Sequence, residues 1–235
     1  CYEVFYNLSN MVLVVNTAAD PEVVLRAADK ILPIQEPKEI IRSYNSEKPE
    51  VNKKRVVAEF EVAKPLFYIG VKDIKISADP LERAKKQATG DILTELLFGA
   101  SSAFGIEMYE SGLANGFAAS FDHDRNSSVV YIQGESDDPE KVYEKVVAHV
   151  EEAKKNGFDR ADFERIKRAE YASYIKSFDS TELAETFTYA LHDGLDWLAY
   201  GDILAGVTYE DVMALLPELF DEKYYAMSVV KPISK

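Results

Sequence analysis

The sequence has little cysteine and little histidine. Its single cysteine is Cys1, so no disulfide bond can form within the chain of 235 residues. That composition fits a reducing compartment, and we expect a cytoplasmic protein. The three histidines are His123, His149 and His192, which leaves few of the imidazole groups that most protein zinc sites use.

Long apolar runs and long runs of one charge are also missing. No segment reaches the roughly 20 apolar residues of a membrane-spanning helix. There is no signal peptide and the first residue is not Met, so we expect a fragment of a longer protein. The net charge of -14 has the wrong sign for nucleic acid or an anionic membrane. With 47% hydrophobic residues, we expect a soluble globular protein without nucleic-acid or membrane partners.

The common catalytic motifs are absent. The sequence contains no H-x-x-E-H, no G-x-S-x-G, no phosphate-binding loop and no Gly-rich dinucleotide fingerprint. The nearest approach to a zinc motif is His149, which Glu152 follows by three residues, but Ala153 stands where the second histidine should be. Val142 and Val146 share a helix face with His149, so we interpret His149 as the edge of a core face.

The other two histidines each precede an aspartate. His123 and Asp124 fall in a predicted hairpin loop, and His192 and Asp193 fall near a predicted helix end. We interpret both pairs as ordinary surface chemistry. We therefore predict no catalytic residue and no metal ligand in this chain.

Helix starts are marked three times by Asp-Pro. In Asp20-Pro21, Asp79-Pro80 and Asp138-Pro139, the aspartate can cap the helix and the proline suits its first position. These signals predict helices over residues 20–32 and 79–99 and a third from residue 138. A short helix through Phe104, Met108 and Tyr109, closed by Gly112, is expected next, and further helices around residues 159–176, 180–193 and 208–219.

Short runs of β-branched and aromatic residues predict the strands. They cover residues 11–15, 55–62, 66–71, 117–121, 129–133 and 226–231. Strands and helices therefore come in separate groups along the chain. That order predicts an α+β fold, a mostly antiparallel sheet with helices packed on one face.

Two distant windows resemble each other. Residues 5–16 and 220–231 both begin with Phe and end with an aliphatic run closing in Val-Val and one polar residue. We interpret residues 1–42 as the C-terminal strand and helix of a truncated preceding repeat, 43–54 as a linker, and 55–235 as a second repeat domain. Chance similarity of two segments is the alternative.

Several motifs in order resemble one known family. They are Phe5-Tyr6 with residues 9–15, Asp20-Pro21-Glu22, Leu96-Leu97-Phe98-Gly99, Ser101-Ser102, Tyr109-Glu110 with Gly112-Leu113, Asp137-Asp138-Pro139-Glu140, and Ser228-Val229-Val230-Lys231-Pro232. Together these segments, which extend over essentially the whole chain, resemble the pitrilysin/insulinase (inverzincin) zinc peptidases, in particular the C-terminal half of a bacterial member.

The resemblance implies a division of labour. Two halves built of repeated α+β domains close around a peptide, and the N-terminal half carries the H-x-x-E-H helix and its zinc. This chain would then be the non-catalytic C-terminal half of a zinc metalloendopeptidase, with no zinc of its own, and a wall of the peptide chamber. The alternative is a structural or protein-interaction member of the same fold whose other half has also lost the motif.

Some members of the family lend an Arg and a Tyr from the second half to the substrate. Here the corresponding segment is residues 107–116, which contains no Arg, and its one tyrosine, Tyr109, comes too early. We predict Tyr109 and Asn115 as substrate-facing residues, with packing or turn chemistry as the alternative. The resemblance also allows a homologous partner subunit to supply the missing pair.

Overall fold

The computed structural model describes residues 2–41, 43 and 48–233. Its elements are α1 (Tyr2–Phe5), the 3-10 helix η1 (Leu8–Asn10), α2 (Pro21–Ile31), β1 (Arg55–Phe60), β2 (Leu66–Lys72), α3 (Pro80–Phe98), α4 (Ala103–Ser111), β3 (Asn115–His123), β4 (Ser128–Glu135), α5 (Pro139–Asn156), α6 (Arg160–Ser177), α7 (Leu183–Asp193), α8 (Trp197–Gly206), α9 (Tyr209–Leu219), the 3-10 helix η2 (Glu222–Tyr224) and β5 (Tyr225–Pro232). Among the described residues, no helix combines the length and apolarity that crossing a membrane requires.

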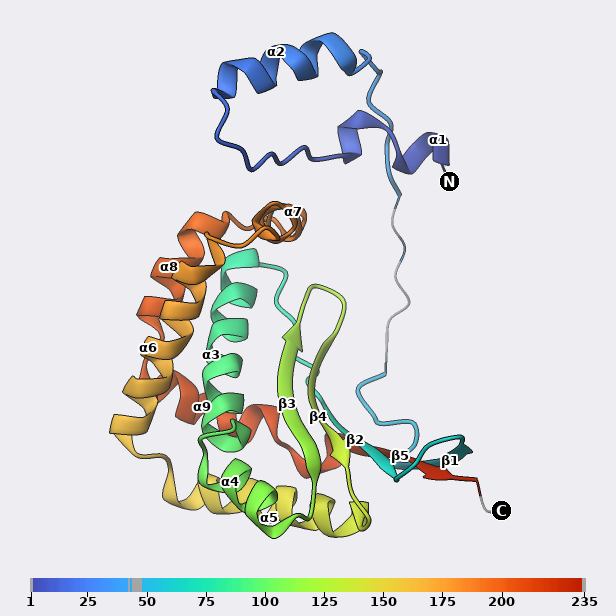
Figure 1. Cartoon of the computed structure of the whole chain (residues 1–235), viewed down its shortest axis with the longest axis vertical. Coiled ribbons are helices and arrows are strands. Elements are labelled where there is room, and N and C mark those ends of the chain that lie inside the picture. Colours follow the sequence, from blue (N-terminus) through green and yellow to red (C-terminus); the bar gives the residue numbers. More distant parts are fainter. Residues whose placement is uncertain (1, 42, 44–47, 234–235) are drawn as a thin grey trace.

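Five strands form one sheet in the order β1-β5-β2-β4-β3. The β1 and β5 strands run parallel, and the other neighbouring pairs are antiparallel. Figure 1 shows α3, α6 and α8 on one side of the strands. The predicted α+β fold, a mostly antiparallel sheet with helices against one face, is confirmed.

The core lies between the sheet and α3. In β2, Phe67, Ile69 and Val71 are buried, as expected where every second side chain points toward the helices. Gly90 of α3 lies so close to Phe121 of β3 that a β-carbon there would come within 2.1 Å of the ring. The helix and the edge strand β3 are therefore in direct contact.

The predicted helix caps form. Asp20, Asp79 and Asp138 each accept a hydrogen bond from a backbone N–H in the first turn of the helix that follows. The sequence did not predict α8, whose ten residues include Gly201 and Gly206, both poor helix formers. Close packing explains the glycine at position 201, because a β-carbon there would lie 2.6 Å from the ring of Tyr174.

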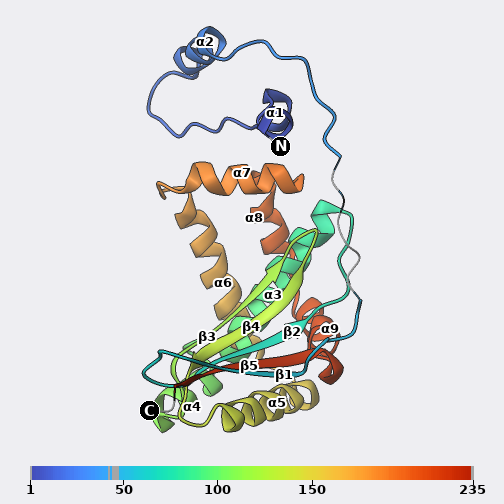
Figure 2. The same ribbon diagram turned by 90° about the vertical axis from the view of Figure 1, so that its right-hand side faces the viewer.

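The strand predicted at residues 11–15 is not formed. The backbone is extended at Met11, with φ -113° and ψ 150°, but no described strand pairs with this segment, and Leu13 is well exposed. A strand needs a neighbour for its N–H and C=O groups, and the sheet lies elsewhere in the chain. Figures 1 and 2 show α1 and α2 away from the sheet. Residue 42, the last of the expected truncated repeat, and residues 44–47 of the expected linker lie outside the described residues.

Candidate functional site

The side of the sheet that faces away from the helices is uncovered. Figure 2 shows β3, β4 and β2 in front of α3, and none of the described helices crosses the middle of these strands. The alternation along β2 agrees, since Tyr68 lies between the buried Phe67 and Ile69 and is 50% exposed. Neighbours of Tyr68 in the adjacent strands share this face.

The centre of this surface, which we call the open sheet face, is uncharged. Tyr68 lies opposite Gln133 of β4 and Ser228 of β5, and Gly70 lies opposite Tyr131. The open sheet face comprises Val56, Tyr68, Gly70, Tyr131, Gln133 and Ser228. An uncharged centre with two tyrosines, bordered on the same face by Lys72, Asp122 and Glu135, is typical of a surface that another protein covers.

The two predicted substrate-facing residues lie near the edge of the sheet. Tyr109 is in the last turn of α4 and is 85% exposed, and Asn115 begins the edge strand β3 opposite Glu135. Gly112, in the left-handed conformation at φ 62°, reverses the chain between them. Neither residue lines the cavity beside His149 or the larger cavity beside α7 and α8, so contact with substrate remains a prediction for both.

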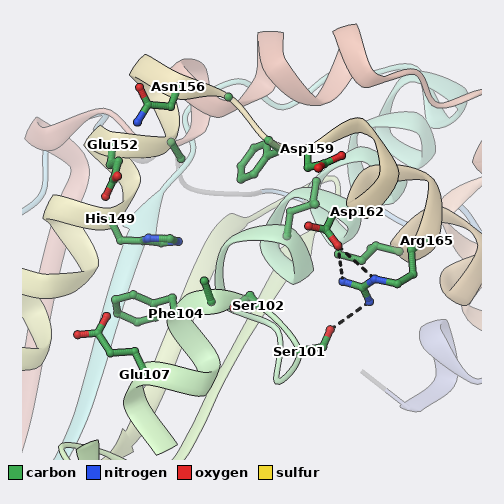
Figure 3. Close-up of a pocket in the computed structure, with 16 residues that line it drawn as sticks. Ser101, Ser102, Phe104, Glu107, His149, Glu152, Asn156, Asp159, Asp162 and Arg165 are labelled. Carbon is green, nitrogen blue, oxygen red and sulfur yellow. Dashed lines mark hydrogen bonds and ion pairs between the residues drawn. The ribbon is translucent and has the colours of Figure 1, made fainter. Parts of the chain in front are cut away.

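His149 lies beside a cavity of about 420 Å³ between α4, α5 and α6. Figure 3 shows its ring above Phe104 of α4, and the two ring centroids are 4.8 Å apart. Its Nε2 is 3.1 Å from the Leu97 carbonyl oxygen, so Nε2–H donates there. Burial lowers the pKa of His149, and the bond to Leu97 opposes that effect. The interpretation of His149 as the edge of a core face is confirmed.

The residues of this cavity do not fit a zinc ion. Asp162 pairs with Arg165, which also donates to Ser101 (Figure 3), and Glu107 pairs with Lys145. Within the described part of the chain, no group of three or more His, Cys, Asp or Glu could hold a metal ion. A zinc site requires at least three protein ligands, and this cavity offers one imidazole.

His123 was placed wrongly by the sequence interpretation. It is the last residue of β3, its side chain is 0% exposed, and its ring stacks on Phe121 with centroids 5.5 Å apart. The hairpin loop is shorter than expected, because β4 already begins at Ser128. The spacing of Phe117, Phe121 and His123 could have placed His123 correctly. Positions separated by an even number of residues share one face of a strand, so His123 lies on the inward face with the two phenylalanines.

A buried hydrogen-bonded chain fixes the His123 ring. Nδ1 is 2.6 Å from Ser128 Oγ, which donates to Asp73 Oδ2 at 2.6 Å. Lys86 Nζ lies 2.7 Å from the same carboxylate oxygen, which therefore accepts from both Lys86 and Ser128. Ser128 therefore accepts from Nδ1–H of His123.

Nε2 of His123 is consequently a bare acceptor. Burial and the nearby Lys86 lower the pKa of His123, so the ring is neutral at pH 7. Nε2 is buried and has no hydrogen-bond partner in the described part of the chain. The third histidine, His192, is exposed near the end of α7, as expected.

Comparison with known sequences identifies relatives of this chain. The profile of a family described as the peptidase M16 inactive domain matches residues 1–170. A protein of Bacillus subtilis (strain 168), described as the uncharacterized zinc protease YmfH, is 27% identical over 224 residues. The match covers 93% of this chain and 52% of that protein. The chain thus spans about half the length of this relative.

Solved structures show the same fold. A protein from Alicyclobacillus acidocaldarius described as an M16-like peptidase superposes with a TM-score of 0.82 at 22% identity, covering 90% of this chain and 51% of that one. A protease from Helicobacter pylori gives 0.76 at 20% identity, covering 91% of this chain and 53% of that one. Both superpositions again place this chain on about half of a longer protein.

Proposed function

Because the chain belongs to the family of the peptidase M16 inactive domain, we propose that it is the C-terminal half of a zinc-dependent metalloendopeptidase and encloses the peptide rather than cleaving it. The expected resemblance to the pitrilysin/insulinase family is confirmed. The observation that carries the proposal is the match over 93% of this chain to 52% of a relative described as a zinc protease. The remainder of such a protein has room for a second half of similar size.

The properties of the open sheet face support its role as a wall of the peptide chamber. This face is uncharged at its centre and partly aromatic, and Tyr131 and Tyr68 are 36% and 50% exposed. A chamber that closes on an unfolded peptide excludes folded proteins by size. It also displaces water, so that zinc and a general base in the N-terminal half act at lower dielectric.

The free strand edges of the sheet support binding of an extended peptide. β1 and β3 are the two edge strands. A peptide added along such an edge is held mainly by its own backbone groups, so its side chains matter little. Asn115 begins β3, and Tyr109 lies in the helix just before it, so both would be near a peptide paired with β3.

The segment without Arg has a consequence for the active site. Residues 107–116 hold Tyr109 but no Arg, so the pair that grips substrate in some family members is incomplete. We propose that a homologous partner subunit supplies it. Zinc and the catalytic base would come from the N-terminal half of the same protein.

Charge on the open sheet face tests the enclosure role. In the full-length protein, the double substitution Tyr68→Arg and Tyr131→Arg should lower kcat/KM for an unfolded peptide at least about tenfold, because buried charges disfavour closure. Leu198→Arg, at a site 61% exposed on α8, is the matched control and should leave kcat/KM unchanged. Equal activity of the double variant and the control would contradict the proposal, provided that circular dichroism shows both are folded.

Reconstitution separates the proposal from the alternative of a protein-interaction member. Full-length protein should bind one zinc ion, and its activity should rise when the homologous partner with the Arg and Tyr is added. Full activity without a partner would refute the shared site. An upstream half without H-x-x-E-H and without bound zinc would favour the non-peptidase alternative.

A further inference from the structure

A second and larger cavity lies on the helix side of the sheet. Its volume is about 790 Å³, within the range of small-ligand sites. Four separate parts of the chain line it: α3, the β3–β4 hairpin, α7 and α8. This groove is distinct from the open sheet face, so a ligand bound in it would be independent of the proposed function.

The cations in the groove are already engaged. Arg83 is buried and donates to both the side chain and the carbonyl of Asp193. Arg125 of the hairpin donates to Asp193 Oδ1 at 3.3 Å and to the His192 carbonyl oxygen at 2.8 Å. The shared carboxylate holds the hairpin, α3 and α7 together. The groove is therefore built before any ligand enters, and its guanidinium groups are poorly placed to capture an anion.

An acidic side chain in the groove has no counter-ion. Asp91 of α3 accepts from Gln87 Nε2 at 2.7 Å and forms no ion pair with any described residue. Burial raises the pKa of Asp91 to about 7, the bond from Gln87 opposes that effect, and the carboxylates of Glu170 and Asp122 add to it. Arg83 and Arg125 line the same groove but are paired with Asp193, and no described cation pairs with Asp91.

His123 is an independent indication of a ligand. His123 is one of the residues that line the groove. Its side chain is fully buried, and Nε2 has no hydrogen-bond partner among the described residues. Because Nδ1 is turned toward Ser128 and Asp73, the opposite edge of the ring, with Nε2, points away from that network. Asp91 when ionised and His123 Nε2 both accept hydrogen bonds, so a ligand group that satisfied either of them would be a donor.

Aromatic rings form the adjoining wall. The rings of Trp197 and Tyr200 on α8 stack with centroids 4.7 Å apart and line the groove. Aromatic faces attract cations. The indole N–H of Trp197 is also buried without a partner in the described part of the chain, and it needs an acceptor such as a backbone carbonyl.

We infer that this groove binds a lysine or arginine side chain of a peptide. The cationic group would pair with Asp91, and its stem would lie against Trp197 and Tyr200. His123 Nε2 and the Trp197 N–H are buried, so the cationic group would reach Nε2, and a carbonyl of the peptide the N–H, only after neighbouring side chains shift. The net charge of -14 attracts such a ligand over longer distances. A metal ion does not fit, since no three ligating residues come together among those described.

The fluorescence of Trp197, the only tryptophan, reports on binding directly. The chain is titrated with the capped peptide acetyl-Ala-Ala-Arg-Ala-Ala-amide and with the same peptide carrying citrulline, which keeps the shape of arginine without its charge. Calorimetry detects binding that leaves the fluorescence unchanged. We expect saturable binding of the arginine peptide and at least about tenfold weaker binding of the citrulline peptide.

Two variants complete the test. Asp91→Asn should weaken the arginine peptide at least about tenfold, whereas Asp202→Asn, an exposed acid on the same helix as Trp197, should not. The affinity of the unsubstituted chain for the arginine peptide should rise about tenfold from pH 6 to pH 8, as Asp91 ionises. The groups that interact with the Asp91 carboxyl are Gln87, Glu170, Asp122 and Tyr200. Equal affinity for the two peptides, or for the two variants, would overturn the inference, as would the absence of any binding heat.

Discussion

Residues 2–41 and residues 51–233 respond differently to similar local signals. In both regions an Asp before a Pro caps a helix, at Asp20 for α2 and at Asp79 for α3. Yet α2 buries no residue at all, whereas α3 buries a side chain in every turn after its first. Helix formation needs only neighbours along the chain, and burial needs a partner in space.

The aliphatic segments show the difference more sharply. The run that begins at Met11 follows a 3-10 helix capped by Asn7, and the run of β5 follows a 3-10 helix capped by Asp221. Only the second becomes a strand, because β1 and β2 flank it. The shared local structure favours the repeat interpretation of residues 1–42, which remains a prediction.

The largest expected contrast is in packing. Leu97→Ala, at a fully buried site in α3, should lower the free energy of unfolding by about 2–5 kcal/mol. Leu13→Ala, in the unpaired segment, should change it by less than about 0.5 kcal/mol. Urea denaturation followed by circular dichroism measures both. Similar losses for the two variants would show that residues 2–41 pack on the domain.

Two helical glycines of the domain differ in the space around them. Gly90→Ala should destabilise by about 1–3 kcal/mol, since the new methyl would collide with the buried ring of Phe121. Gly206→Ala, in α8, meets no atom within 4 Å and should be neutral or slightly stabilising. A neutral Gly90→Ala in thermal unfolding would mean that the contact between α3 and β3 is looser than the structure shows.

Asp91 should make stability depend on pH. Its pKa is raised in the folded state to about 7 from a usual value of 3.8, so between these values the folded chain holds a proton that the unfolded chain has released. Stability from this group should therefore fall as pH rises, by up to about 1.4 kcal/mol per unit. Asp91→Asn should remove this slope in urea denaturation from pH 4 to 7.

The matched control for that experiment is Asp20→Asn. Because α2 buries no residue, changing its cap should leave the unfolding of the domain unaltered at every pH. If the free energy of unfolding still falls with rising pH in Asp91→Asn, the dependence arises from other carboxylates.

The smallest effect is expected from removing the N-terminal region. Deleting residues 1–50 should shift the free energy of unfolding of the remaining domain by less than about 0.5 kcal/mol, since α2 and the described residues between it and residue 50 bury no apolar side chain. Calorimetry of the shortened chain measures the shift. A loss of several kcal/mol would show that the two regions form one cooperative unit.

Particular residues show where sequence reasoning stopped. The alternation of β2 and the caps of α3 and α5 were readable because they depend on positions close in sequence. The sequence did not predict α8, because only the contact with Tyr174 on α6 explains a glycine at position 201 within a helix. The buried position of His123 was missed because its partners come together only in the sheet: β3 pairing with β4 brings it to Ser128, and β2 pairing with β4 brings Asp73 to Ser128.

Local sequence was enough to predict the Asp-capped starts of α2, α3 and α5, the ranges of the five strands of the sheet, the α+β class and the lack of a zinc motif in this chain. Each depends on residue type and on spacings of a few positions, which set local hydrogen bonds and side-chain direction. The tertiary structure alone decided that β5 lies between β1 and β2, that one sheet face stays open, and that Asp91, His123 and Trp197 line one groove. These features join residues far apart in the chain, and only the packing of α3 and α8 against each other and of α3 against the sheet brings them within contact.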